Sequence, residues 1–248
     1  MRKTVNIAGV KVDSVTMAQA VENLKSFINE SGVHSIYTPN AEIVMEAYSD
    51  ENLRSILNQS DMLVADGAGV ILASRILGLD LPEKVSGIDL IKESFSMDIG
   101  RKTRYFFFGS KPGVAETAAA NISAAHPGIE IVGCRNGYFS KEEEPGIIEE
   151  INAAAPDILL VALGAPKQEK WIHENRHKLK AKVCIGCGGT LDVFAGKAKL
   201  APEYIRKAGF EWLYRLCHEP WRFKRMMKLP KFILLVTAMK LKLVKSPQ

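Results

Sequence analysis

Short runs of aliphatic, aromatic and β-branched residues alternate along the chain with longer segments whose apolar residues recur at helical spacing. The short runs are almost wholly apolar, which is typical of strands buried on both faces of a sheet. Strands separated by helices favour a parallel sheet with helices on each side. The predicted strands are 34–38, 62–65, 104–108, 129–133, 158–163 and 182–187, and the predicted helices are 16–30, 41–58, 68–78, 88–98, 113–125, 141–154 and 167–179.

This succession of elements predicts an α/β fold with a Rossmann-like, doubly wound and mostly parallel sheet. A chain of 248 residues, of which 47% are hydrophobic, can bury one full core. The opening segment VNIAGVKVD predicts a small hairpin beside the sheet. We therefore expect residues 1–198 to form an α/β core that carries the candidate catalytic site.

Residues 199–248 differ from this core. Trp, Phe, Met and Leu alternate there with Arg and Lys, and the helical pattern is interrupted near Pro220 and Pro230. The longest charge-free run, 232–239, has eight residues, whereas a helix that spans a bilayer needs about 20. The pattern predicts a basic, amphipathic, helical appendage that lies on a membrane surface rather than crossing it.

The distribution of charge supports this interpretation. From Lys197 onward there are 13 lysine and arginine residues and three glutamates, whereas the rest of the chain has 20 basic and 25 acidic residues. A basic segment beside an acidic body suggests an anionic partner. The first residues lack the apolar run and cleavage site of a signal peptide. We expect a cytoplasmic protein, peripheral on the anionic inner face of the cell membrane, with no nucleic-acid partner.

Asp66 is the most informative single residue, because it lies between an apolar run and two glycines in VADGAGV. Ligands of a doubly wound sheet bind beyond the carboxyl ends of its strands, where this residue is expected. One interpretation is a carboxylate base, and the alternative is the N-cap of the next helix. A nicotinamide site has weak support, because Ala73 comes one place late for the G-x-G-x-x-G/A fingerprint.

Polar or flexible residues follow three other predicted strands. TPNAE places Thr38 and Asn40 there, and the alternative role of Asn40 is to cap the next helix. GAPKQE places Gln168 at a strand-to-helix turn. GCGG places Gly188 and Gly189 where backbone amides can cradle a phosphate, the alternative being a tight turn without a ligand.

The segment YRLCHEPWRFKRM contains Arg215, Arg222 and Arg225, which are candidates for holding a diphosphate because a guanidinium can bind two phosphate oxygens at once. The alternative is a solvated cationic face that binds lipid headgroups. The pair Cys184 and Cys187 lacks the second pair of ligands that a zinc site needs, and we interpret it as buried, reduced thiols. No metal site is therefore expected.

Several segments together resemble a known family. They are similar in order and spacing to those of the WecG/TagA/CpsF glycosyltransferases, glycosyltransferase family 26, from about residue 5 to about residue 235. The most similar branch is that of the TagA-type N-acetylglucosaminyldiphosphoundecaprenol N-acetyl-β-D-mannosaminyltransferases of wall teichoic acid synthesis. The segments are TPNAEIV, VADGAGV, VALGAPKQEKWI, GCGGTLDVFAGKAKLAP and EWLYRLCHEPWRFKRM.

The resemblance implies an inverting transfer of N-acetylmannosamine from UDP-N-acetylmannosamine to the 4-hydroxyl of N-acetylglucosamine on undecaprenyl diphosphate. It implies that Asp66 is the base, and that the three arginines close over the nucleotide diphosphate. The residues it places in a polar pocket are Thr38, Asn40 and Gln168. Many relatives have arginine where this chain has Lys84, a difference that keeps the charge but loses bidentate geometry.

Direct displacement needs no organic cofactor, and the sequence has no D-x-D motif for a divalent metal. We therefore expect cationic side chains and helix N-termini to stabilise the departing UDP. The resemblance also suggests a homo-oligomer. The alternative donor within the family is UDP-N-acetylmannosaminuronic acid, and the alternatives outside it are a noncatalytic membrane-binding scaffold and a nicotinamide oxidoreductase.

Overall fold

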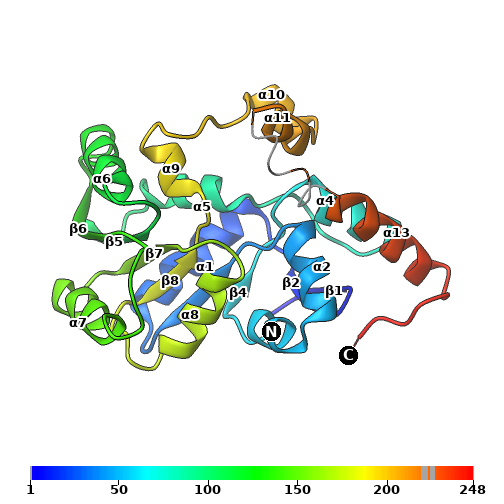
Figure 1. Cartoon of the computed structure of the whole chain (residues 1–248), viewed down its shortest axis with the longest axis horizontal. Coiled ribbons are helices and arrows are strands. Elements are labelled where there is room, and N and C mark those ends of the chain that lie inside the picture. The colour runs from blue at the N-terminus through cyan, green and yellow to red at the C-terminus, as the bar shows by residue number, and fades with distance from the viewer. Residues whose placement is uncertain (1, 219–222, 224–226, 248) are drawn as a thin grey trace.

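The centre of the computed structural model, which describes residues 2–218, 223 and 227–247, is a six-stranded sheet (Figure 1). The strand order is β4-β3-β8-β7-β5-β6, and every neighbouring pair is parallel. β1 and β2 form a separate antiparallel hairpin, as predicted. The strands are β1 (Thr4–Ile7), β2 (Val10–Asp13), β3 (His34–Tyr37), β4 (Met62–Leu63), β5 (Thr103–Gly109), β6 (Ile129–Arg135), β7 (Ile158–Ala162) and β8 (Val183–Gly186).

Helices of the α/β core alternate with these strands and cover both faces of the sheet. They are α1 (Met17–Asn29), α2 (Ala41–Ser49), α3 (Glu51–Asn58), α4 (Ala68–Leu77), α5 (Gly87–Ser94), α6 (Val114–Ala125), α7 (Glu144–Ala154), α8 (Lys167–Asn175) and α9 (Thr190–Phe194). One buried hydrophobic cluster joins the sheet to α1, α5, α6 and α9, and a second joins it to α2, α3, α7 and α8. The predicted doubly wound α/β fold is therefore confirmed.

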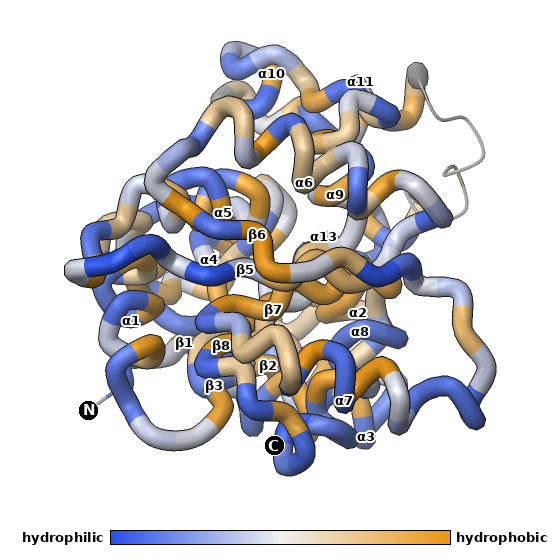
Figure 2. Tube along the Cα trace, turned by 90° about the vertical axis from the view of Figure 1, so that its left-hand side faces the viewer, coloured by the Kyte–Doolittle hydropathy of each residue, from blue (hydrophilic) through white to orange (hydrophobic). Residues whose placement is uncertain are grey.

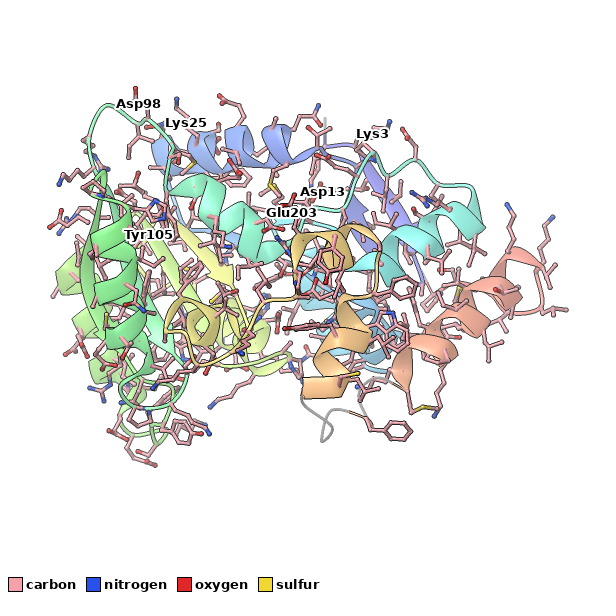
Figure 3. All side chains as sticks on the ribbon, turned by 90° about the horizontal axis from the view of Figure 1, so that it is seen from above. Lys3, Asp13, Lys25, Asp98, Tyr105 and Glu203 are labelled. Carbon is pink, nitrogen blue, oxygen red and sulfur yellow. The ribbon has the colours of Figure 1, made fainter. Side chains whose placement is uncertain are left out.

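Alternate strand residues face opposite sides of the sheet, which explains the two clusters. Phe106 and Phe108 of β5 belong to one cluster, whereas Tyr105 and Phe107 belong to the other. All of these side chains are buried, so the strand shows no alternation of polar and apolar residues. In Figure 2 hydrophobic colours gather around β7 in the middle of the molecule, and Figure 3 labels Tyr105 on the side of the molecule where β5 lies.

The predicted helix 41–58 is wrong in one respect, because Asp50 divides it into α2 and α3. The Asp50 backbone is extended, and its N–H donates to the carbonyl of Glu46 at 2.8 Å, which ends α2. Its carboxylate accepts the N–H of Leu53 at 3.0 Å and so begins α3. A short acidic side chain at this position satisfies a free helical amide, so a new helix starts where one continuous helix was expected.

The other predicted elements agree with the structure to within a few residues, with two exceptions. β4 was predicted over 62–65 but comprises only Met62–Leu63, because the chain leaves the sheet before Asp66. The short helix α9, which follows the GCGG segment, was not predicted. The sheet is also wholly parallel rather than mostly so.

Residues 199–248 contain α10 (Glu203–Lys207), α11 (Glu211–His218) and α13 (Lys228–Lys240). α13 packs beside α2 and α4 (Figure 1), and its side chains Phe232 and Val236 are fully buried in the core cluster. Lys228 adds an ion pair with Glu46 of α2 at 3.0 Å. The last helix is thus anchored on the α/β core, and the boundary between a core and an appendage at residue 198 stays a prediction.

The interruption predicted near Pro230 is the start of α13. This helix begins at Lys228, so the proline lies in its first turn, where a missing backbone N–H costs little. Pro220 lies outside the described residues.

The burial of α13 leads to a testable prediction. Phe232→Ala removes a fully buried ring, and we expect the free energy of unfolding to fall by about 3–5 kcal/mol. Leu234→Ala lies on the same helix but changes a side chain that is 70% exposed, so it should alter this free energy by less than about 0.5 kcal/mol. Urea denaturation followed by circular dichroism measures both. Two equally small effects would show that α13 is not part of the core.

Candidate functional site

The candidate residues of the α/β core gather at one edge of the sheet. β4, β3, β8 and β7 are neighbours in the sheet and run in the same direction, so their carboxyl ends lie at the same edge. The residues that follow these strands are, in that order, Asp66, Thr38 with Asn40, Gly188 with Gly189, and Gln168. This is the edge at which doubly wound sheets bind their ligands.

Backbone hydrogen bonds bring the segments around Asp66 together. The N–H of Asp66 donates to the carbonyl of Pro39 at 3.3 Å, which joins the end of β4 to the segment that starts α2. The N–H of Val85 donates to the carbonyl of Ala65 at 3.0 Å, which places Lys84 beside the same strand end. Two segments far apart in the sequence therefore flank Asp66.

Asp66 is not the N-cap of α4, so that interpretation of its role is wrong. The N-cap is Gly67, which has φ +83° and offers no side-chain hydrogen bond to the helix. A positive φ of this size favours glycine over any residue with a Cβ. Asp66 itself precedes this cap and is half-buried.

Asp66, Asn40 and Lys84 line one cleft, which we call the Asp66 cleft. Its opposite wall comes from α10, α11 and the first turn of α13. The full set of lining residues is Asn40, Ala41, Glu42, Asp66, Gly67, Ala68, Gly69, Lys84, Arg206, Gly209, Glu211, Trp212 and Leu229. Three of the predicted site residues thus share a single concave surface.

Within this wall, α10 and α11 form ion pairs with the core. Lys84 Nζ lies 4.0 Å from Glu211 Oε2 at the start of α11. Arg206 Nη1 of α10 donates to both carboxylate oxygens of Asp89 at 2.9 and 2.8 Å. Both arginine and lysine are largely covered by protein, so solvent screens these contacts less than it screens surface pairs.

Asn40 caps α2, as one of its two interpretations predicted. Its side-chain oxygen accepts the N–H groups of Glu42 and Ile43 at 3.0 and 3.1 Å. The residue also lines the Asp66 cleft, so a contact with a ligand stays a prediction. Thr38 packs against the first residue of α5 instead: a Cβ added to Gly87 would come within 2.8 Å of its hydroxyl oxygen.

Gln168 lies beneath the glycine turn and outside the Asp66 cleft. Its side chain is buried, and its Oε1 accepts the N–H of Gly188 at 2.9 Å. Gly188 has φ +53° and Gly189 is the N-cap of α9, so these residues form the tight turn that connects β8 to α9. The binding of a phosphate by this turn stays a prediction.

The predicted arginines fall largely outside the described part of the structure. Arg215 belongs to α11, and only its backbone is described. Arg222 and Arg225 lie outside the described residues. The position of α11, whose first residues Glu211 and Trp212 line the Asp66 cleft, brings the start of this arginine-containing segment to the site.

Sequence reasoning did not single out Arg206, Glu211 or Trp212 as site residues. The signal was present, because Glu211 and Trp212 open the segment EWLYRLCHEPWRFKRM. Arg206 stands five residues before that segment, in a stretch interpreted only as membrane-binding. The return of α10 and α11 to the strand ends is a tertiary feature that local pattern does not show.

The cysteine pair agrees with its prediction. Cys184 and Cys187 are free and buried, and burial raises the pKa of the Cys184 thiol to about 12. Cys217 is also free but exposed. Within the described ranges, no group of three or more His, Cys, Asp or Glu side chains is placed to hold a metal ion.

Comparison with known proteins identifies the family. The model of the glycosyl transferase WecG/TagA/CpsF family matches residues 5–246. The chain belongs to this family. It is 37% identical over 222 residues to the N-acetylglucosaminyldiphosphoundecaprenol N-acetyl-beta-D-mannosaminyltransferase of Bacillus subtilis (strain 168), covering 86% of each chain. It is 34% identical over 244 residues to the protein of that name from Staphylococcus aureus (strain MRSA252), covering 98% of this chain and 95% of the relative.

A second Bacillus relative of the same name, from Bacillus spizizenii (strain ATCC 23059 / NRRL B-14472 / W23), is 34% identical over 208 residues, or 84% of this chain and 80% of the relative. Membership of the family makes the chain a glycosyltransferase that transfers a hexosyl group. The interpretations as a nicotinamide oxidoreductase and as a noncatalytic scaffold are therefore not supported, and the polar residues at the strand ends belong to a transferase.

Proposed function

We propose that this glycosyltransferase moves N-acetylmannosamine from UDP-N-acetylmannosamine to the 4-hydroxyl of N-acetylglucosamine on undecaprenyl diphosphate, in the linkage unit of wall teichoic acid. The names of the Bacillus subtilis and Staphylococcus aureus relatives state this sugar and this acceptor. The observation in the molecule that carries the proposal is the Asp66 cleft, where a half-buried carboxylate lies at the ligand-binding edge of the sheet with Lys84.

Asp66 is the proposed general base. In a direct displacement with inversion, the acceptor oxygen attacks the anomeric carbon while the bond from that carbon to UDP breaks. The proton of the acceptor hydroxyl passes to the Asp66 carboxylate. The backbone of Asp66 is bonded to Pro39, and the preceding residue is bonded to Val85, so the base is held in place before substrate arrives.

The departing UDP gains negative charge, and cationic groups at the cleft are proposed to stabilise it. Lys84 lies 4.0 Å from Glu211, a distance at which a diphosphate can compete with the glutamate for the ammonium group. Arg215, Arg222 and Arg225 are proposed to act with Lys84, since α11 borders the cleft. In the glycine turn the Gly188 N–H is already bonded to Gln168, and the N–H of Gly189 is proposed to bind the same diphosphate.

Replacement of the proposed base tests the reaction. Asp66→Asn keeps the shape of the side chain but cannot accept the proton, so we expect kcat to fall by about 100-fold or more. The assay is release of UDP from UDP-N-acetylmannosamine with a lipid-diphosphate N-acetylglucosamine acceptor. Asp98→Asn is the matched control, because Asp98 is exposed on a connection far from α10 (Figure 3).

Equal turnover by the wild type and Asp66→Asn would show that Asp66 is not the base. If the wild type is inactive with UDP-N-acetylmannosamine but active with UDP-N-acetylmannosaminuronic acid, the proposed type of reaction is right and the proposed donor sugar is wrong. Inactivity with both donors, with folded protein and intact acceptor, would overturn the proposed function.

We further propose that these cations replace the divalent metal that many nucleotide-sugar transferases bind through a D-x-D motif. Removal of metal ions by EDTA is accordingly expected to leave the rate of UDP release unchanged. The same assay measures it, with magnesium and manganese added back in separate samples. Loss of activity with EDTA that Mn²⁺ restores would contradict the proposal.

The acceptor's polyprenyl chain lies in the bilayer, so we propose that the α10 and α11 region docks on the anionic inner leaflet of the cell membrane. Large apolar side chains there are exposed: Tyr204 by 74%, Phe210 by 54% and Leu213 by 42%. Apolar groups beside basic ones suit the interface of an anionic membrane. No helix in the described part of the chain is both long and apolar enough to cross a bilayer.

Vesicle binding tests this docking. We expect the wild type to co-sediment with phosphatidylglycerol vesicles and to bind phosphatidylcholine vesicles more weakly. Phe210→Ser combined with Leu213→Ser should lower the affinity for the anionic vesicles by about tenfold or more, since each buried side chain contributes about 1.5–3 kcal/mol. Tyr138→Ser, which changes a 65% exposed aromatic residue after β6, is the control. Unchanged binding by the double variant would place the membrane contact elsewhere.

A further inference from the structure

The orientation of the Gln168 amide follows from the hydrogen bonds around it. A backbone N–H can only donate, so the Gln168 atom that lies 2.9 Å from the N–H of Gly188 is the carbonyl oxygen Oε1. The amide nitrogen Nε2 then faces Glu169, and it donates to Glu169 Oε1 at 2.9 Å. Both polar ends of this buried side chain are thus bonded within the protein.

Glu169 is a buried carboxyl group that the proposed reaction does not use. It is 1% exposed, and its second oxygen, Oε2, is buried without a hydrogen-bond partner among the described residues. An ionised carboxylate in such a place is costly. Burial accordingly raises the pKa of Glu169, and the nearby carboxylate of Glu46 raises it further. Burial therefore favours the protonated, neutral form of this carboxyl group.

The surroundings hold this pair of side chains in a single arrangement. A Cβ added to Gly186, the last residue of β8, would lie 2.9 Å from Gln168 Nε2, so the amide occupies space that only glycine leaves open. The hydroxyl of Tyr37 on β3 donates to the backbone carbonyl of Glu169 at 3.2 Å. The start of α8 is therefore fixed against both β3 and β8.

We propose that Glu169 is a positioning residue, which acts through Gln168 to hold the Gly188 turn in the conformation that receives the diphosphate of the sugar donor. A direct chain of hydrogen bonds runs from Glu169 Oε1 through the Gln168 amide to the N–H of Gly188. In this arrangement Gln168 acts on the turn through its bond to the Gly188 N–H. The inference rests on the proposed function in assigning the diphosphate to this turn.

The kinetic test compares variants of the two residues. Glu169→Gln keeps a neutral side chain whose oxygen still accepts from Gln168, so we expect activity within about threefold of the wild type, with an unchanged pH profile. Glu169→Ala and Gln168→Ala should each lower kcat/KM by about 10- to 100-fold, and the double variant should lose no more than either. Glu174→Ala, which changes an exposed carboxylate on the same helix, is the control.

The division of the loss between kcat and KM separates positioning from direct contact. A turn that stabilises charge on the departing UDP affects kcat, because that charge develops in the transition state. A Gln168→Ala loss confined to KM, or one much larger than that of Glu169→Ala, would overturn the inference. Loss of activity in Glu169→Gln equal to that in Glu169→Ala would do the same, since it would show that the charge matters.

Two measurements without substrate keep the inference distinct from the proposed function. Hydrogen exchange at the Gly188 amide should accelerate by about tenfold in Glu169→Ala. Gly186→Ala should have the same effect, because its new Cβ displaces Gln168 while Glu169 is kept. Exchange in Glu169→Gln should stay at the wild-type rate. Infrared spectroscopy at neutral pH should show a protonated carboxyl band that Glu169→Gln removes. Absence of that band, or unchanged exchange in both disruptive variants, would overturn the inference. If exchange and the infrared band behave as expected but the wild type does not release UDP, the proposed function fails and the positioning role of Glu169 stands.

Discussion

The parallel pairing of β3 with β8 is the interaction on which the rest of the site depends. His34, Ser35 and Ile36 pair with Val183, Cys184 and Ile185, which lie far away in the sequence. This contact joins the β4-β3 part of the sheet, which carries Asp66, to the β8-β7-β5-β6 part, which carries the glycine turn. Because the strands are parallel, both parts present their carboxyl ends, and hence their polar residues, at the same edge.

The C-terminal region contributes to this edge by a different kind of contact. α13 is held mainly by buried apolar side chains, with one flanking ion pair between Lys228 and Glu46, whereas α10 and α11 contact the core through the ion pairs of Arg206 and Lys84. A nearby anion does not weaken contacts between buried apolar side chains. In an ion pair, by contrast, an anionic ligand or lipid headgroup competes with the carboxylate for the cationic side chain. The opposite wall of the Asp66 cleft is thus the part of the site whose contacts a diphosphate or an anionic headgroup can exchange.

Two acidic side chains near the strand ends illustrate how environment decides their chemistry. Asp66 is half-buried and lines an open cleft together with Lys84. Glu169 is buried near the start of α8; one of its oxygens is bonded to an amide, and the other has no hydrogen-bond partner within the part of the chain that the structure describes. The same functional group is thus open to a ligand in the first place and enclosed by protein in the second.

The amino-acid sequence by itself determined the fold class, the positions of the strands and the family, because apolar runs and short polar motifs are local properties. It also placed Asp66, Asn40 and Gln168 at strand ends. It did not show whether Asp66 caps α4, predict the break at Asp50, or show that Arg206 and Glu211 reach the cleft. Only the tertiary structure decided these points, because each depends on which backbone amides are already bonded and on which distant segments pack together.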